Sequence, residues 1–226
     1  MINKIYKILA KKYTVIFIMI IATILSYFDR NYGYFFGLGI VFLILKGTNF
    51  KWSEFGLVKK INKKTIFKSL LFAIVIFIGI DIFIQPFLEI YFGPIDLSSV
   101  DDIRGDFINY VILMIIMWVF AAFGEELLFS GYYMKQIAKI LGDTNRAWIL
   151  SVFIISIYFG ISHNYQDTSG MIAVGLASFC SFMIFAKNRD NLILVILIHG
   201  FYDTIGLTLI YLNKDRIFFD WIQQML

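Results

Sequence analysis

Long apolar stretches recur along this chain, and they constrain its fold more than any other feature. A membrane-spanning helix needs about 20 predominantly apolar residues. Of the 226 residues, 60% are hydrophobic and 16% are charged, whereas a soluble globular chain has about 45–50% and about 25%. The sequence therefore predicts an all-α, polytopic bundle of about seven transmembrane helices. These are expected at 13–28, 32–46, 66–90, 107–129, 147–163, 170–186 and 191–211.

The basic residues are distributed unevenly over the segments that connect these helices. If the N-terminus is cytosolic and the spans alternate, most of the 20 lysines and arginines lie on the inner side. They include Lys4, Lys7, Lys11 and Lys12. Because Lys and Arg near span ends resist translocation, we expect a multi-pass protein with its N-terminus inside and its C-terminus outside. The net charge is +4. Because of this distribution we expect the basic residues to contact membrane lipids, and we do not expect the protein to bind nucleic acid.

Three regions follow from this pattern. Residues 1–106 hold the first spans and a basic cytosolic linker, 107–212 hold the core spans, and 213–226 form a short C-terminal segment. The last ten residues are expected to form a short helix at the outer interface. The single cysteine, Cys180, excludes a disulfide framework and a cysteine-rich zinc site. Abundant Ile, Lys, Phe and Asn are typical of a low-GC bacterium, so we expect a bacterial cell membrane.

Ionisable residues within the apolar segments are the candidates for function. A charge at the bilayer centre costs at least about 2.5–3.5 kcal/mol, so such residues need a reason to be there. Glu125 and Glu126 are adjacent, with apolar residues on both sides. On an α-helix neighbouring side chains point about 100° apart, so the two carboxylates are expected to have different roles. Asp81, near Pro86, is either a structural partner or a residue that faces water.

The two histidines of the chain each have a companion four residues away. His163 follows Phe159, and His199 precedes Asp203, so each pair shares one helix face. A single histidine in an apolar helix is usually a packing residue. Two of them, with a carboxylate pair in a third segment at comparable depth, predict one polar cluster formed by three helices.

The order of these motifs resembles the CPBP family, which comprises CAAX proteases and bacteriocin-processing enzymes, also called Abi proteins. The resemblance covers about residues 120–205. It implies an intramembrane endopeptidase that hydrolyses a membrane-associated protein or a peptide precursor. In family models a glutamate and a histidine activate water, and a second histidine with the following Asn or Asp stabilises the oxyanion. Carried over, these roles fall to Glu125 with His163 and to His199 with Asp203, and Glu126 completes the catalytic set.

The cofactor and the exact function stay open at this point. A metal-dependent version of the reaction would place Zn²⁺ on His163, His199 and Glu125, whereas a metal-free version needs no cofactor. The alternative to an enzyme is a non-catalytic membrane immunity or partner-binding protein of the same family. A proton-coupled transporter is less well supported, because no inverted repeat is visible.

One position departs from the family pattern. The first motif of the family usually ends in Arg, where this chain has Ser130. An arginine would supply a fixed cation and five donors to hold a carboxylate. An arginine at this position could reach back to Glu126, four residues before it, so we expect a Ser130→Arg substitution to be tolerated and to leave activity equal or raised. If Ser130 and Gly131 instead mark a close helix contact, an arginine would separate the helices.

Overall fold

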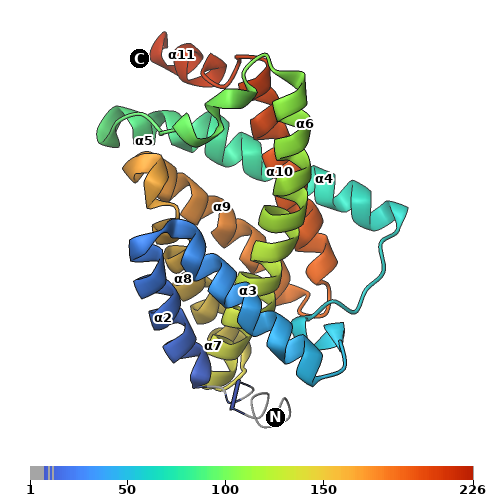
Figure 1. Ribbon diagram of the computed structural model, residues 1–226. Coiled ribbons are helices and arrows are strands. Elements are labelled where there is room, and N and C mark those ends of the chain that lie inside the picture. Colours follow the sequence, from blue (N-terminus) through green and yellow to red (C-terminus); the bar gives the residue numbers. More distant parts are fainter. Residues whose placement is uncertain (1–7, 10, 12, 226) are drawn as a thin grey trace.

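The computed structural model describes residues 8–9, 11 and 13–225, and every regular element among them is helical (Figure 1). Within these residues the only strand-like pairing is an isolated bridge between Leu57 and Asn191. The predicted all-α class is confirmed. Three of the N-terminal lysines, Lys4, Lys7 and Lys12, lie outside the described residues.

The helices follow one another with short connections. In chain order they are α2 (Thr14–Phe28), α3 (Arg30–Gly47), η1 (Trp52–Phe55), α4 (Lys63–Phe77), η2 (Ile78–Ile84), α5 (Gln85–Phe92), η3 (Ser98–Ile103), α6 (Phe107–Ile116), η4 (Met117–Met134), α7 (Lys135–Ile140), α8 (Asn145–Ser162), η5 (Asn164–Gln166), α9 (Asp167–Lys187), α10 (Leu192–Tyr211) and α11 (Ile217–Gln223). The elements η1, η3 and η5 are 3₁₀ helices, and η2 and η4 are π-helices. α11 confirms the expected short C-terminal helix.

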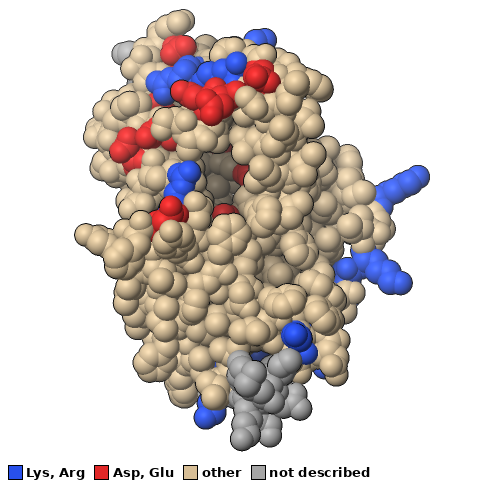
Figure 2. Space-filling view, in the orientation of Figure 1, with Lys and Arg blue, Asp and Glu red and all other residues tan. Residues whose placement is uncertain are grey.

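Five continuous helical stretches among the described residues are long and apolar enough to cross a membrane. They are Lys63–Phe92, Phe107–Ile140, Asn145–Ser162, Asn164–Lys187 and Leu192–Tyr211. α2 is apolar but shorter, and the polar first turn and terminal charges of α3 lower its mean hydropathy. Figure 2 shows a broad uncharged surface on this face below its upper charged groups, with further basic side chains at the right edge and near the lower end. These features support a multi-pass membrane protein, while the count of seven spans and the orientation stay predictions.

Short polar residues fix where several of these helices begin. Asp29 separates α2 from α3, and its carboxylate accepts a hydrogen bond from the Asn31 backbone N–H at 2.8 Å. Asn62, Asp106 and Thr144 accept backbone hydrogen bonds in the same way at the starts of α4, α6 and α8. Such caps satisfy N–H groups that lack an intrahelical partner. They set the register in which the later residues of each helix meet the core.

Two long helices contain wide π-helical turns. α4 continues through η2 into α5, and α6 continues through η4 into α7. Asp81 lies in η2, and Glu125 and Glu126 lie in η4. The prediction of ordinary α-helical spacing for the glutamate pair is therefore wrong, because the π-helix is wider than the α-helix that the sequence argument assumed. π-helical turns are rare and often occur at functional sites.

Close packing between α8 and α9 positions the end of α8. A Cβ on Gly160 would lie 2.8 Å from the Met171 carbonyl oxygen and 3.1 Å from the Gly175 Cα. These two helices approach so closely because both present glycine at the crossing. α10 packs against α4 and η4, so a helix from the N-terminal region contacts the core spans directly.

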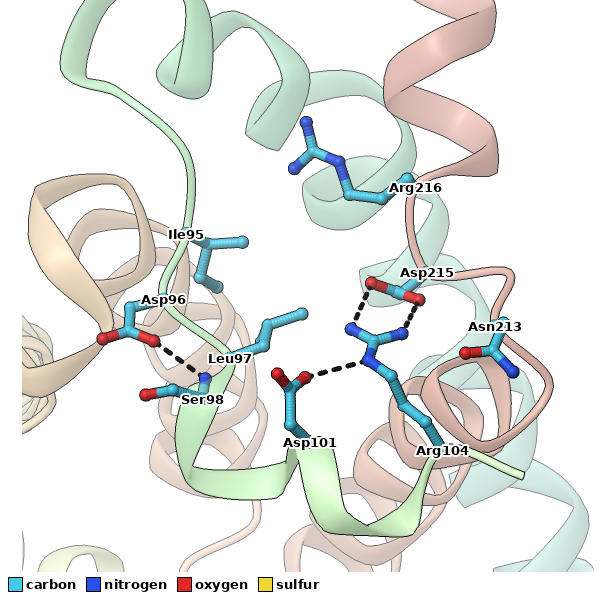
Figure 3. A pocket seen from close by; sticks show the side chains of 9 residues that line it. All are labelled: Ile95, Asp96, Leu97, Ser98, Asp101, Arg104, Asn213, Asp215 and Arg216. Carbon is cyan, nitrogen blue, oxygen red and sulfur yellow. Dashed lines mark hydrogen bonds and ion pairs between the residues drawn. The ribbon is translucent and has the colours of Figure 1, made fainter. Parts of the chain in front are cut away.

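At one end of the bundle, charged residues connect three segments of the chain (Figure 3). The Arg104 guanidinium donates two hydrogen bonds to Asp215, at 2.5 and 2.9 Å, and a third to Asp101 at 2.8 Å. Arg216 donates to Glu89 in α5. These pairs link the segment around η3 and α5 to the connection between α10 and α11.

Candidate active site

A cavity of about 660 Å³ lies between the helices, and its lining includes all five residues predicted for the site. Figure 2 shows the hollow on one face of the molecule, with acidic side chains visible inside it. Much of the remaining lining is apolar and aromatic. The five predicted residues are Glu125, Glu126, His163, His199 and Asp203.

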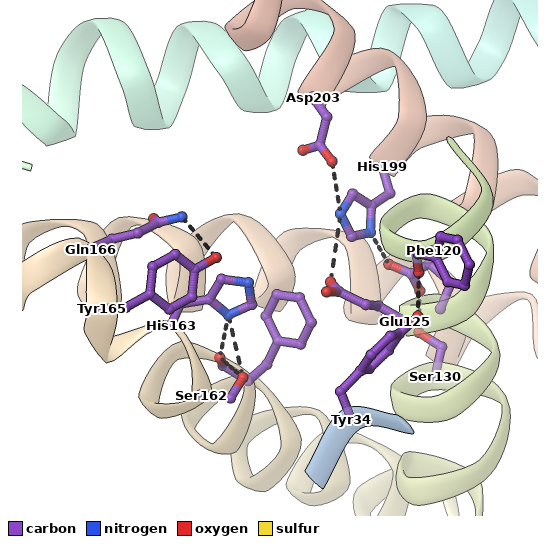
Figure 4. Close-up of polar contacts among 12 residues, drawn as sticks. Tyr34, Phe120, Glu125, Ser130, Ser162, His163, Tyr165, Gln166, His199 and Asp203 are labelled. Carbon is purple, nitrogen blue, oxygen red and sulfur yellow. Dashed lines mark hydrogen bonds and ion pairs between the residues drawn. The ribbon is translucent and has the colours of Figure 1, made fainter. Parts of the chain in front are cut away.

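His199 on α10 is surrounded by three carboxyl groups (Figure 4). Its Nδ1 lies 3.2 Å from Glu126 Oε1. On the opposite edge, Nε2 lies 3.3 Å from Asp203 Oδ2 and 4.0 Å from Glu125 Oε2. Each of these contacts is attractive when the ring nitrogen carries a proton, since a carboxylate only accepts hydrogen bonds. The arrangement favours an imidazolium that is held on both edges.

The buried Glu126 has a second partner in its own helix. The Ser130 hydroxyl donates to Glu126 Oε2 at 2.5 Å, and both residues are buried. The family's arginine position therefore carries a hydroxyl that reaches the glutamate directly. Ser130 has no exposed surface, and a Cβ on the next residue, Gly131, would lie 3.1 Å from the Phe55 carbonyl oxygen. Of the two expectations for this position, the structure favours the close helix contact.

His163 caps the C-terminus of α8 and faces the cavity from the other side. Its Nδ1 lies 2.8 Å from the Phe159 carbonyl oxygen. A carbonyl oxygen only accepts, so Nδ1 carries the hydrogen and the lone pair of the neutral ring is on Nε2. His163, at the end of α8, and Glu125, in η4, both line the cavity (Figure 4). The Phe159 ring contacts both imidazoles, with ring centroids 4.6 Å from His163 and 6.3 Å from His199.

The cavity also contains residues that the sequence reasoning missed. The Tyr34 hydroxyl donates to the Phe120 carbonyl oxygen at 2.5 Å. The Tyr165 ring lies 5.6 Å from the His163 ring, and the Arg30 guanidinium lies 4.2 Å from the centre of Tyr165. Tyr165 follows His163 by two positions, so its closeness in the sequence could have indicated that it belongs to the site. Arg30 and Tyr34 come from α3, and no motif links α3 to the histidines.

The residues proposed for a metal do not fit one in this arrangement. Among the described residues, no three side chains of His, Cys, Asp or Glu are grouped so that they could hold a metal ion. Both ring nitrogens of His199 already face carboxyl groups, so a metal there would have to displace one of them. His163 offers only its Nε2, because Nδ1 is engaged with a backbone carbonyl.

Comparison with known families identifies the segment that carries this site. Residues 107–205 match the model of the family described as type II CAAX prenyl endopeptidase Rce1-like. This segment is similar to the Rce1-like family. No curated protein and no solved structure matches the chain.

The Rce1-like match confirms the resemblance to CAAX proteases over a little under half of the chain. The family consists of membrane endopeptidases, so protease activity is supported at the family level. The matched range contains all five predicted site residues and lies within the core region predicted at 107–212. The division of the chain into three regions stays a prediction.

Proposed function

We propose that this protein is an intramembrane endopeptidase that cleaves a membrane-associated protein or peptide precursor. The observation that carries the proposal is a cavity lined by both Glu125 and His163, beside a histidine held by carboxyl groups on both edges. A water molecule and a peptide carbonyl group can both enter this cavity. The Rce1-like match supports the same reaction class.

In the proposed reaction, Glu125 is the general base. A water molecule between Glu125 and His163 donates one hydrogen bond to the carboxylate and the other to His163 Nε2. Glu125 takes a proton as the water oxygen attacks the peptide carbonyl carbon, which forms a tetrahedral oxyanion. Orientation by two acceptors and removal of a proton by a positioned base are the ordinary means of accelerating such a step.

His199 is the proposed donor to the oxyanion. Glu126 fixes its Nδ1 edge, and this directs Nε2 toward the cavity. When Glu125 becomes protonated, it no longer competes as a charged acceptor for the Nε2 hydrogen, and the oxyanion then shares that hydrogen with Asp203. Asp203, 3.3 Å from Nε2, keeps the ring in its charged form. Glu125 then passes its proton to the leaving amine, and the C–N bond breaks.

Replacement of the base tests this function directly. The probe is a farnesylated peptide with a CAAX C-terminus in vesicles that contain the purified full-length protein, and cleavage is followed by mass spectrometry. Glu125→Gln is expected to lower the rate by about 10²–10⁴-fold, because general-base catalysis contributes about that factor. Glu54→Gln is the control, since Glu54 pairs with Lys51 at the surface and does not line the cavity. A Glu125→Gln variant with the wild-type rate would contradict the proposal.

The same variant separates the enzyme from the alternative role. Ser130 in place of the usual arginine is the feature that favours a non-catalytic immunity or partner-binding protein. Such a protein would not cleave the probe, and Glu125→Gln would leave its protective effect in cells unchanged. A wild-type protein that cleaves, together with an inactive and stably folded Glu125→Gln variant, would exclude this alternative.

A further inference from the structure

Asp81 is a carboxyl group at membrane depth that the proposed reaction does not use. It lies in the π-helical segment η2 and lines the same cavity as the catalytic residues. Its Oδ2 is buried and has no hydrogen-bond partner among the described residues. Asp81 also takes part in none of the ion pairs that the described residues form. A buried carboxylate oxygen without a hydrogen bond is costly, so this atom requires an explanation.

Two further oxygen atoms line the cavity from neighbouring helices. Ser181 on α9 has a buried hydroxyl that also lacks a hydrogen-bond partner in the described part of the chain. Tyr202 on α10 directs its hydroxyl toward the Asp81 carboxyl group. η2 packs against α9. Acceptor oxygens from three helices therefore face one cavity, and two of them are unsatisfied.

The charge of the cavity indicates which ligand these oxygens suit. Among the described residues, its lining contains four carboxyl groups, from Asp81, Glu125, Glu126 and Asp203, but only two cationic groups, the Arg30 guanidinium and the His199 imidazolium. Arg30 lies against the Tyr165 ring, beside His163. An ammonium group has three N–H donors and no acceptor. It would supply both the missing charge and the missing donors at Asp81.

We propose that Asp81, Ser181 and Tyr202 form a subsite that binds a positively charged amino group of the substrate. This Asp81 subsite rests on the proposed function and assigns a substrate class to it: peptides with an ammonium group close to the bond that is cleaved. The closeness follows from the chain itself, because Tyr202 precedes Asp203 of the catalytic cluster on α10. The ammonium belongs either to a lysine side chain or to a peptide N-terminus.

A binding experiment on the purified full-length protein in detergent tests the Asp81 subsite without cleavage. Three small probes share one aliphatic chain: Nα-acetyl-lysine methylamide, norleucine methylamide and Nα-acetyl-norleucine methylamide. The first carries a side-chain ammonium, the second an α-ammonium, and the third no charge. At about ten times Kd, a bound probe is expected to raise Tm by roughly 3–6 °C. At least one charged probe should raise Tm, and the neutral probe should not. The charged probe that raises Tm shows whether the ammonium comes from a lysine side chain or from a peptide N-terminus.

Substitutions then locate the bound ammonium. Asp81→Asn keeps the shape of the side chain and removes its charge, and it is expected to abolish the Tm shift. Asp102→Asn is the control, since Asp102 is exposed and does not line the cavity; it should keep the full shift. If Asp81→Asn does not fold, Ser181→Ala should reduce the shift, and the contrast between charged and neutral probes in the wild type remains a test.

Two outcomes would overturn the subsite. One is a wild-type protein whose Tm responds equally to the neutral and the charged probes, or to none of them. The other is a folded Asp81→Asn variant that keeps the wild-type shift, which would place the ammonium at another carboxyl group. Either result could occur while Glu125-dependent cleavage is intact. Conversely, Asp81-dependent binding in a protein that cleaves nothing would refute only the proposed function.

Discussion

At the scale of single residues, Ser130 supplies a hydrogen-bond donor to Glu126 at the position where the resemblance leads one to expect an arginine. The Ser130 hydroxyl is the hydrogen-bond donor to Glu126 Oε2, and Glu126 in turn faces His199. Ser130→Ala removes this donor and leaves a buried acceptor unsatisfied, at a cost of about 1–3 kcal/mol. We expect a lower Tm and a cleavage rate reduced several-fold, because Glu126 then holds His199 less firmly. Tm and the rate on the farnesylated peptide measure both effects.

Ser130→Arg should be more damaging than Ser130→Ala. Ser130 is fully buried beside a close backbone contact at Gly131, and extra volume in a packed core costs about 1–3 kcal/mol or more. The expected result is little folded protein on size-exclusion chromatography. Ser53→Ala, at an exposed position, serves as the control. A Ser130→Arg protein that folds and cleaves at least as fast as the wild type would show that the family's cation can still be accommodated.

Part of the site could be predicted from residue spacing alone. The four-residue interval between His199 and Asp203 brings their side chains to 3.3 Å because both lie on one α-helix. The contact of Glu126 with His199 needed two helices to pack, and the motif order only suggested it. Asp81 was recognised as an ionisable group, but its empty hydrogen-bonding position depends on α9 and α10, which no local pattern describes.

At the scale of helices, Gly124 in η4 allows α3 to approach the site. A Cβ at Gly124 would overlap the Tyr34 hydroxyl, which is fixed by its hydrogen bond to the Phe120 carbonyl oxygen. Gly124→Ala is therefore expected to displace Tyr34 and to lower stability by about 1–3 kcal/mol. Tyr34→Phe removes the hydroxyl and costs about 1 kcal/mol by itself. The double variant should lose less stability than the two single variants combined, since the overlap disappears.

Thermal unfolding of the four proteins in this cycle measures the coupling between the two residues. Gly39→Ala, in α3, is the matched control because nothing lies within 4 Å of a Cβ there. It should be neutral or slightly stabilising, since alanine favours helix over glycine. Additive losses in the Gly124 and Tyr34 variants would show that the two residues do not oppose each other as the structure indicates.

The helices themselves were predictable to different degrees. Apolar length located the core spans, since Asn145–Ser162 and Leu192–Tyr211 lie close to the predicted 147–163 and 191–211. The π-helical character of η4 was not predictable, because hydropathy does not distinguish a π-helical turn from an α-helical turn. That turn geometry depends on tertiary packing, in which Gly124 and Gly131 of the same segment accept close neighbours.

At the scale of the whole molecule, the cavity depends on more of the chain than the Rce1-like segment. Asp81 and Tyr34 lie outside residues 107–205, yet both line the cavity. α4 packs against α10, the helix that carries His199. The motifs predicted where the chemistry is concentrated, but the walls come from helices that only tertiary packing brings together. The N-terminal helices are therefore part of the site and not only a membrane anchor.

The ion pairs at the end of the bundle connect these regions and make a prediction about pH. Arg104 donates two hydrogen bonds to Asp215, and they hold the pKa of that carboxyl group below its usual value. Because the folded-state pKa is depressed, the pair stabilises the fold above the unfolded pKa of about 3.9 and loses this effect as pH falls through the folded pKa. Asp215→Asn should cost about 1 kcal/mol near pH 7.

Thermal unfolding of wild type and Asp215→Asn from pH 7 to pH 3 tests this pair. The Tm difference is expected to be roughly 2–4 °C at neutral pH. It should shrink once pH falls below about 4, because Asp215 then binds a proton in the unfolded chain before it does so in the folded protein. Arg104 keeps its charge throughout, since the two aspartates raise its pKa further. Asp102→Asn, at an exposed position, should show no such convergence. A difference between wild type and Asp215→Asn that stays constant down to pH 3 would mean that the carboxylate charge does not hold this end of the bundle together.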